Sequence, residues 1–227
     1  MRAPRPKQYL PLLGRAVILH TLERLCSYAP VQGVLVGLAP GDTYWSELNC
    51  HFPRLLGTFE GGGTRALTVL NGLRALARHA KPEDWILVHD AARPCLRHSD
   101  IDKLIHTVGQ HKGGGVLGLP IADTLKRADD SDHIVETVAR TDLWRALTPQ
   151  MFRLGPLTQA IEQALKAGVI ITDEAAAMEY AGVRPRLVIG HADNIKITVP
   201  ADLALAELYL QRQAGESLPN EKTEKRS

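Results

Sequence analysis

Residues Asp84 to Pro94 constrain the fold more than any other stretch of this chain. An apolar run from Trp85 to Val88 stops abruptly at His89 and Asp90. A short apolar segment bounded by polar turn residues is typical of a parallel strand covered on both faces. Charged residues then fall at its carboxyl end, where open α/β sheets hold their ligands. Asp90 with Arg93 therefore suits a divalent metal and a phosphate, although an Asp that caps the next turn explains the same spacing.

Strand and helix patterns alternate along the rest of the chain. Short apolar runs predict strands at 33–38, 55–59, 85–88, 114–119 and 186–189. Amphipathic spacing predicts helices at 12–28, 42–49, 64–79, 100–111, 155–167, 172–180 and 200–213. This alternation predicts the α/β class with a mostly parallel sheet.

Residues 121–143 have a different sequence pattern, in which apolar and polar residues alternate around a polar turn at 129–132. This pattern predicts an extended β-hairpin arm inserted in the domain. A two-stranded hairpin is marginal in water, so we expect it to pack against something else, such as a second subunit. We expect one domain over 1–214, followed by a polar, disordered tail at 215–227.

Composition excludes several classes of function. The net charge of +2 gives no reason to expect a nucleic-acid partner, and no run of about 18 apolar residues predicts a membrane span. The first seven residues lack the apolar core of a signal peptide. Cys26, Cys50 and Cys95 fit neither a disulfide framework nor a zinc site, so a cytoplasmic location is the simplest expectation.

Four further segments carry candidate chemistry, each with a simpler alternative. Glu60 to Arg65 contains three glycines before a predicted helix, which suits close approach to a ligand but is also a common turn. Lys7 is a candidate phosphate ligand or a solvated charge. Thr172 is a candidate helix N-cap whose neighbouring amides could hold a phosphate. Lys196 lies in an alternating segment, Asp193 to Thr198, that also fits an edge strand.

Taken together, these segments place two Lys, two Arg, two Asp and a glycine loop at predicted strand ends. That set suits the binding of a triphosphate and one Mg²⁺ while another phosphate attacks.

Six segments occur in an order that resembles a known family. They are Pro6-Lys7-Gln8-Tyr9, Gly61-Gly62-x-x-Arg65-x-x-Thr68-Val69, Val88-His89-Asp90-Ala91-Ala92-Arg93-Pro94, Leu147-Thr148-Pro149-Gln150, Ile171-Thr172-Asp173-Glu174-Ala175 and Asp193-Asn194-Ile195-Lys196. The chain to about Leu210 is similar to the bacterial 2-C-methyl-D-erythritol 4-phosphate cytidylyltransferases of isoprenoid-precursor synthesis. Thr68 stands where the family usually has Ser.

The resemblance implies a Rossmann-like fold of the nucleotide-diphospho-sugar transferase type and a Mg²⁺-dependent transfer of CMP from CTP, with release of pyrophosphate. It also implies roles for individual residues. Lys7, Asp90 and Lys196 would be catalytic, with Asp90 as the metal ligand. Residues expected to bind CTP are Gly62, Gly63, Arg65, Thr68 and Arg93. Residues expected to hold the methylerythritol phosphate are Thr124, Arg140, Thr148, Thr172 and Lys196. Thr124 and Arg140 lie on the arm, which in the family reaches the other subunit of a homodimer.

One departure from the family pattern concerns the start of the chain. Family members open with a strand and a glycine-rich, Arg-containing loop, and Met1 falls where the Met that ends this loop would be. We expect that the true start lies roughly 20 residues upstream. The alternative is that the gene product is truncated. On that basis the chain as written would fold poorly and be nearly inactive. The alternatives to the main hypothesis are a cytidylyltransferase for another polyol phosphate, such as ribitol 5-phosphate, and a non-catalytic dimeric sugar-phosphate-binding relative.

Overall fold

The computed structural model describes residues 5–109 and 111–216. These residues form two compact units, each built from segments that are far apart in the sequence. Unit 1 contains the described residues of 1–62, 90–98 and 193–227, and unit 2 contains 63–89 and the described residues of 99–192. A single domain over 1–214 stays a prediction.

Unit 2 is built on a four-stranded sheet. Its strand order is β10 (Arg186–Ile189), β6 (Gly115–Pro120), β9 (Trp144–Arg153) and β5 (Trp85–Val88). β10 pairs parallel with β6, whereas β9 runs antiparallel to both β6 and β5. Three of the four strands therefore run one way, which fits the predicted mostly parallel sheet.

Strand β9 is the longest element that the sequence pattern missed. Its residues Leu147 to Phe152 are all buried, although Thr148 and Gln150 interrupt the apolar run. These polar side chains are hydrogen-bonded inside the unit, so the strand can be buried without being a continuous apolar run.

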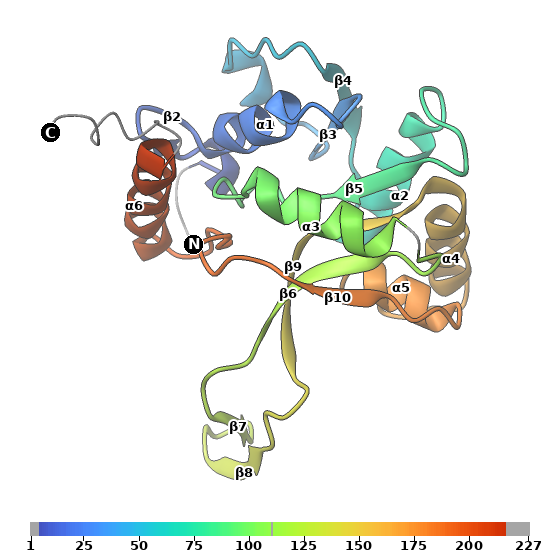
Figure 1. The fold of residues 1–227 in the computed structure, drawn as a ribbon, viewed down its shortest axis with the longest axis vertical. Helices are drawn as coiled ribbons and strands as arrows, with labels where there is room; N and C mark the ends of the chain where they lie inside the picture. The colour runs from blue at the N-terminus through green and yellow to red at the C-terminus, as the bar shows by residue number, and fades with distance from the viewer. Residues whose placement is uncertain (1–4, 110, 217–227) are drawn as a thin grey trace, which may run out of the picture. The chain divides into compact units, whose positions relative to one another are not determined.

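The predicted arm is present as a hairpin of β7 (Leu125–Ala128) and β8 (Ile134–Val138). The Asp129 carboxylate accepts hydrogen bonds from the backbone N–H groups of Ser131 and His133, which fixes the turn. Figure 1 shows the hairpin projecting away from the sheet of unit 2. Its side chains are largely exposed.

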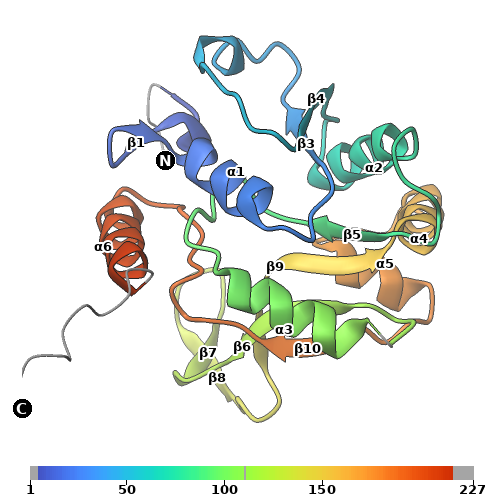
Figure 2. The same cartoon turned by 45° about the horizontal axis from the view of Figure 1, so that its top comes forward.

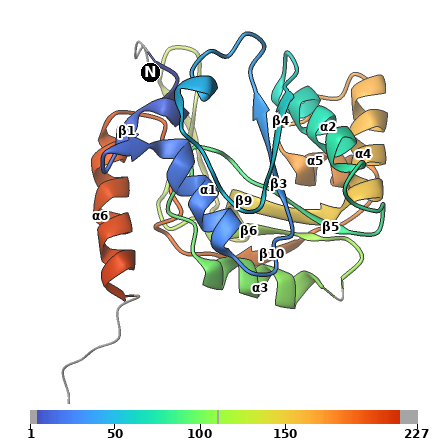
Figure 3. The ribbon, with the colours of Figure 1, turned by 90° about the horizontal axis from the view of Figure 1, so that it is seen from above.

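Helices cover both faces of the unit 2 sheet (Figures 2 and 3). On one face, α2 (Arg65–Leu76), α4 (Leu154–Lys166) and α5 (Glu174–Tyr180) share a core with Ile86, Val116 and Phe152. Helix α3 (His98–Val108) lies on the other face, where Gly115 leaves room for Val108. Successive residues of β6 thus face opposite cores, as alternation along a strand requires.

Unit 1 opens with short elements. They are η1 (Lys7–Tyr9), β1 (Pro11–Leu12), β2 (Arg15–Ala16), α1 (Val17–Ser27), β3 (Val34–Leu38), η2 (Trp45–Glu47) and β4 (Leu55–Glu60). β3 and β4 pair in parallel. The predicted helix start at Leu12 is wrong, because Leu13 and Gly14 adopt φ of 49° and 76° and turn a small hairpin. The predicted helix at 42–49 is a 3₁₀ turn instead, with Asp42 accepting from the N–H groups of Tyr44 and Trp45.

Helix α6 (Ala201–Glu216) ends the described chain and contacts β1 (Figure 3). Ala206 and Leu210 on this helix pack against Ala92, Cys95 and Ile197. The tail predicted from 215 begins too early, since the helix includes Gly215 and Glu216, while 217–227 lie outside the described residues. No helix within the described ranges is both long enough and apolar enough to cross a membrane.

Candidate active site

Four of the predicted site residues lie together in unit 1. The Asp90 carboxylate is 3.0 Å from the Lys196 ammonium nitrogen and 3.2 Å from Arg93 Nε. Lys7 is close enough that Asp90, Arg93 and Lys196 all influence its pKa. We call Lys7, Asp90, Arg93 and Lys196 the Asp90 cluster. It brings three cationic side chains to one carboxylate, so it carries excess positive charge that suits an anionic ligand.

Two loops carry three residues of the Asp90 cluster, and the fourth, Lys7, lies in η1. The 90–97 loop follows β5, and the 193–198 loop precedes α6. The backbone N–H of Ile197 donates to the Ala92 carbonyl at 2.9 Å, and Arg93 Nη1 donates to the Asn194 carbonyl at 2.8 Å. These bonds set Lys196 opposite Asp90. The alternative of an edge strand at Asp193 to Thr198 is wrong, because this segment is a loop.

Lys7 stands in an unusual electrostatic environment. Partial burial is the main cause that lowers its pKa, and the nearby Lys196 lowers it further. Asp90 and Asp202 act in the opposite direction, but the net direction is downward. A lysine in this state gains more than usual from an anion that arrives beside it.

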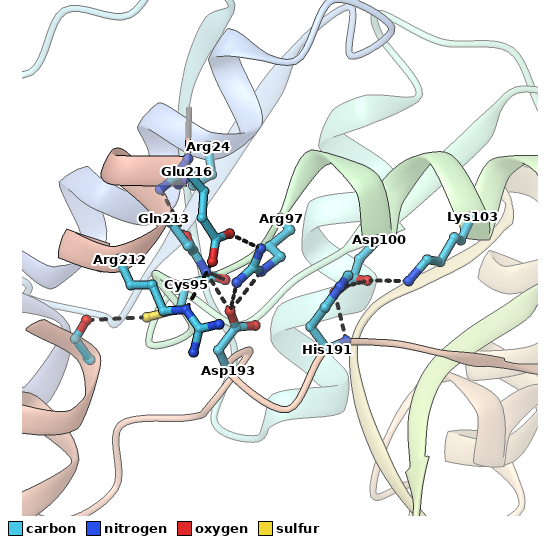
Figure 4. A network of polar contacts seen from close by, with 11 residues as sticks. Arg24, Cys95, Arg97, Asp100, Lys103, His191, Asp193, Arg212, Gln213 and Glu216 are labelled. Atoms are coloured by element: carbon cyan, nitrogen blue, oxygen red, sulfur yellow. Dashed lines mark hydrogen bonds and ion pairs between the residues drawn. The ribbon is translucent and has the colours of Figure 1, made fainter. Parts of the chain in front are cut away.

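A buried network supports the two loops from the side of α6 (Figure 4). Asp193, a residue that is 7% exposed, accepts through its carboxylate from Arg97 Nε at 2.7 Å and from Gln213 Nε2 at 3.0 Å. Gln213 also donates to the Cys95 carbonyl at 2.9 Å and accepts from Arg24 at 3.0 Å. Glu216 completes the network through an ion pair with Arg97. Helix α6 is thereby bonded to both loops of the Asp90 cluster.

The predicted nucleotide loop leads into α2. Thr64 is the N-cap of this helix, and its hydroxyl accepts from the Leu67 N–H at 3.2 Å. The Thr68 hydroxyl donates to the Thr64 carbonyl at 3.0 Å. Gly63 is exposed, and a Cβ atom added there would meet open space. Gly62 is partly buried one residue earlier. The loop therefore places glycine backbone at the start of a helix, an arrangement that favours anions.

The predicted sugar-phosphate residues Thr148 and Thr172 lie in unit 2. The buried Thr148 hydroxyl is 2.9 Å from His89 Nδ1. Thr172 is exposed immediately before α5. The prediction that Thr172 caps this helix is wrong, because Asp173 accepts from the Ala176 N–H at 2.9 Å. The Thr172 side chain is therefore not the N-cap of α5, and Thr172 stays a candidate for ligand binding.

Thr124 and Arg140 flank the paired strands of the arm. Both residues are exposed, and Arg140 donates a hydrogen bond to the Ala122 carbonyl. The structure therefore holds the predicted residues in two groups, the Asp90 cluster in unit 1 and the Arg65, Thr148 and Thr172 group in unit 2.

A magnesium ion fits the Asp90 cluster only with help from a ligand. Among the described residues, no three His, Cys, Asp or Glu side chains gather in a way that could hold a metal. Mg²⁺ is commonly bound by one or two carboxylates together with substrate phosphates. Asp90 supplies one carboxylate that is still partly accessible, which is sufficient for that mode of binding.

Several residues of these networks were not predicted as site residues. Gln213 and Arg97 carry no motif, and only the folded chain brings them to Asp193. Glu174 was visible as an acidic residue in the first turn of a predicted helix, a position that the helix dipole alone explains. Its pairing with Arg65, 109 residues away, needed the structure.

Comparisons with known proteins agree with this architecture. The profile of the family described as 2-C-methyl-D-erythritol 4-phosphate cytidylyltransferase matches residues 1–212. A protein of that name from Azoarcus sp. (strain BH72) is 51% identical over 217 residues, covering 95% of this chain and 90% of the relative. One from Hahella chejuensis is 48% identical over 212 residues, covering 93% and 88%.

Solved structures give the same result. The crystal structure of a 4-diphosphocytidyl-2C-methyl-D-erythritol synthase superposes with a TM-score of 0.82 at 41% identity, covering 90% of this chain and 95% of that one. The Francisella tularensis 2-C-methyl-D-erythritol 4-phosphate cytidylyltransferase gives 0.82 at 32% identity, covering 90% and 93%.

The fold and these matches define a nucleotidyltransferase of the Rossmann-like α/β type. Within that class, the chain belongs to the 2-C-methyl-D-erythritol 4-phosphate cytidylyltransferase family.

Proposed function

We propose that this chain transfers CMP from CTP to 2-C-methyl-D-erythritol 4-phosphate and releases pyrophosphate, as a step of isoprenoid-precursor synthesis. Membership of the family over residues 1–212 carries this proposal. The excess of positive charge in the Asp90 cluster supports it, because both substrates and the leaving group are phosphates.

The chemistry requires an oxygen of the acceptor phosphate to attack the α-phosphorus of CTP in line with the departing pyrophosphate. The acceptor is already ionised, so a general base adds little. The protein's contribution is positioning and charge stabilisation. Lys7 and Lys196 would bind phosphate oxygens and balance the negative charge that develops, while Arg93 holds the 193–198 loop through Asn194.

Asp90 would hold Mg²⁺ beside the CTP phosphates, where the ion would neutralise part of their charge. One oxygen of this carboxylate, Oδ2, contacts both Lys196 and Arg93.

Gly62 at the end of a unit 1 segment, together with Gly63, Arg65 and Thr68 of unit 2, would bind the nucleotide, and Thr148 and Thr172 of unit 2 would bind the acceptor phosphate. Thr124 and Arg140 would act on the acceptor of a partner subunit in a cytoplasmic homodimer. Their exposure on the projecting hairpin supports this arrangement.

A pyrophosphate-release assay with CTP, Mg²⁺ and the methylerythritol phosphate tests the proposal. Turnover that depends on all three components would support the proposal, and full turnover by the chain that begins at Met1 would refute the expected upstream start. Ribitol 5-phosphate in place of the acceptor should give little pyrophosphate, and faster release with ribitol 5-phosphate would identify the alternative enzyme. Calorimetric binding of the sugar phosphate without any binding of CTP would identify the non-catalytic relative instead.

A further inference from the structure

A buried ion pair in unit 2 joins the starts of two helices. Arg65 is the first residue of α2, and Glu174 is the first residue of α5. Arg65 Nη1 donates to Glu174 Oε1 at 2.6 Å, and Nη2 donates to Oε2 at 3.0 Å. The fork of the guanidinium therefore meets both carboxylate oxygens, which fixes angle as well as distance.

The exposure of the two partners is unequal. The Glu174 side chain is 1% exposed, whereas that of Arg65 is 36% exposed. Burial is the main cause that raises the pKa of Glu174, and the Arg65 guanidinium opposes it. Apolar residues of similar volume often stabilise a fold as well as a buried ion pair does. Stability alone therefore gives no reason to place a charge here.

The pair stands between the two predicted ligand segments of unit 2. Arg65 directly follows Gly63 and the N-cap Thr64, and Thr68 lies one turn further along α2. Glu174 directly follows Thr172 and the N-cap Asp173.

The Glu174 side is itself held rigidly. The Gln150 side chain donates to Asp173 at 2.9 Å and accepts from the Ala175 N–H at 2.9 Å. Gln150 is 1% exposed and lies on β9, two residues from Thr148. A continuous set of bonds thus runs from β9 through the start of α5 to the start of α2.

We infer that Glu174 is a positioning residue. It fixes the position of the Gly63–Thr68 segment relative to Thr148 on β9 and Thr172 before α5, so that binding of either substrate orders the residues that bind the other. The inference rests on the proposed function for the identity of the two ligands. The ordering is reciprocal: CTP raises the affinity for the sugar phosphate by the same factor as the sugar phosphate raises the affinity for CTP.

Glu174→Gln tests this inference, because it keeps the shape of the side chain but removes its charge and one of its two acceptors. Glu162→Gln is a matched control. Glu162 also accepts from an arginine of α2, Arg74, at 2.8 Å, but that pair is exposed on both sides, at 59% and 44%. The measurements are calorimetric affinity for CTP with and without the sugar phosphate, and the KM of each substrate.

In the unmodified protein we expect each substrate to tighten binding of the other by at least about fivefold. Glu174→Gln should abolish this factor and raise both KM values, with a smaller change in kcat. Glu162→Gln should leave the linkage factor between the two substrates and both KM values within about twofold of those of the unmodified protein. Arg65→Lys keeps Glu174 electrostatically compensated but loses the fork, so it should also lose the factor while staying folded.

A variant with a lower melting temperature but an unchanged linkage factor and unchanged KM values would overturn the inference, since Glu174 would then be structural only. So would an unmodified protein that binds both ligands independently. Failure of the proposed function is a separate result. It would appear as absence of pyrophosphate release from the unmodified protein, while calorimetry still reports on linkage.

Discussion

The two units each contain a carboxylate bound by an arginine, and the pairs differ in their surroundings. In unit 1, Asp90 makes a single contact with Arg93 and shares its charge with Lys196 and, at longer range, Lys7. In unit 2, Glu174 meets the Arg65 guanidinium through two contacts and is almost completely buried. One site has excess cations and the other is balanced.

This difference indicates two uses of the same chemical groups. An excess of positive charge around a partly accessible carboxylate is stabilised further when an anion or a metal–phosphate complex arrives. A balanced, buried pair gains nothing from such a ligand and instead fixes the geometry of the segments that it joins. We therefore expect changes in unit 1 to act mainly on rate and changes in unit 2 to act mainly on stability and binding.

Asp90→Asn should have the largest effect on activity. It keeps the size of the side chain but removes the carboxylate of the cluster and the proposed metal ligand. We expect kcat/KM to fall about 10²–10³-fold, the usual cost of losing one preorganised electrostatic group, with a small change in melting temperature. A variant that kept most of its activity would show that catalysis depends on the cationic side chains of the cluster and not on Asp90.

The pH dependence of kcat/KM should report Lys7. Burial and Lys196 lower the pKa of Lys7, so its charge is lost at a lower pH than that of an ordinary lysine. Activity should therefore fall as pH rises through this lowered value. Lys7→Arg keeps the charge at higher pH and should move the fall in activity upward. An identical alkaline limb in both proteins would mean that another group is responsible.

Arg65→Ala should mainly reduce stability, because it leaves Glu174 buried without its partner. We expect a loss of about 3 kcal/mol in the free energy of unfolding near neutral pH. Burial raises the pKa of Glu174, so this carboxyl takes up a proton as pH falls, and the destabilisation should shrink in acid and grow as pH rises. Urea unfolding at several pH values measures this.

The matched control for this change is Arg74→Ala, which removes an exposed pair on the same helix. It should cost less than about 0.5 kcal/mol and show no comparable pH dependence.

Apart from the Arg74→Ala control, Gln213→Leu should give the smallest effect of this series. It removes hydrogen bonds to the Cys95 carbonyl and Asp193, and Arg97 still pairs with Asp193. We expect a cost of about 1–3 kcal/mol in stability and a modest fall in kcat/KM, because the two loops of the Asp90 cluster lose one shared support. An effect on stability without any effect on kcat/KM would show that the bonds from α6 do not help to position the Asp90 cluster.

Local patterns predicted most of the elements. The strands at 85–88 and 186–189 and the hairpin around 129–132 fall where the sequence places them, because short apolar runs and polar turns are local signals. One error lies where side chains find distant partners, since strand β9 carries buried polar residues that are bonded within unit 2. Another is local, because Asp173 takes the cap position expected for Thr172.

The sequence by itself determined the α/β alternation, the family, and the residue types of the Asp90 cluster, since these depend on motifs that are short and contiguous. Only the tertiary structure decided that Lys7, Asp90 and Lys196 come together, that Gln213 bonds to the loops beside them, and that Glu174 pairs with Arg65. Such pairings join residues separated by up to about two hundred positions, and no local propensity encodes which distant charge a side chain will meet.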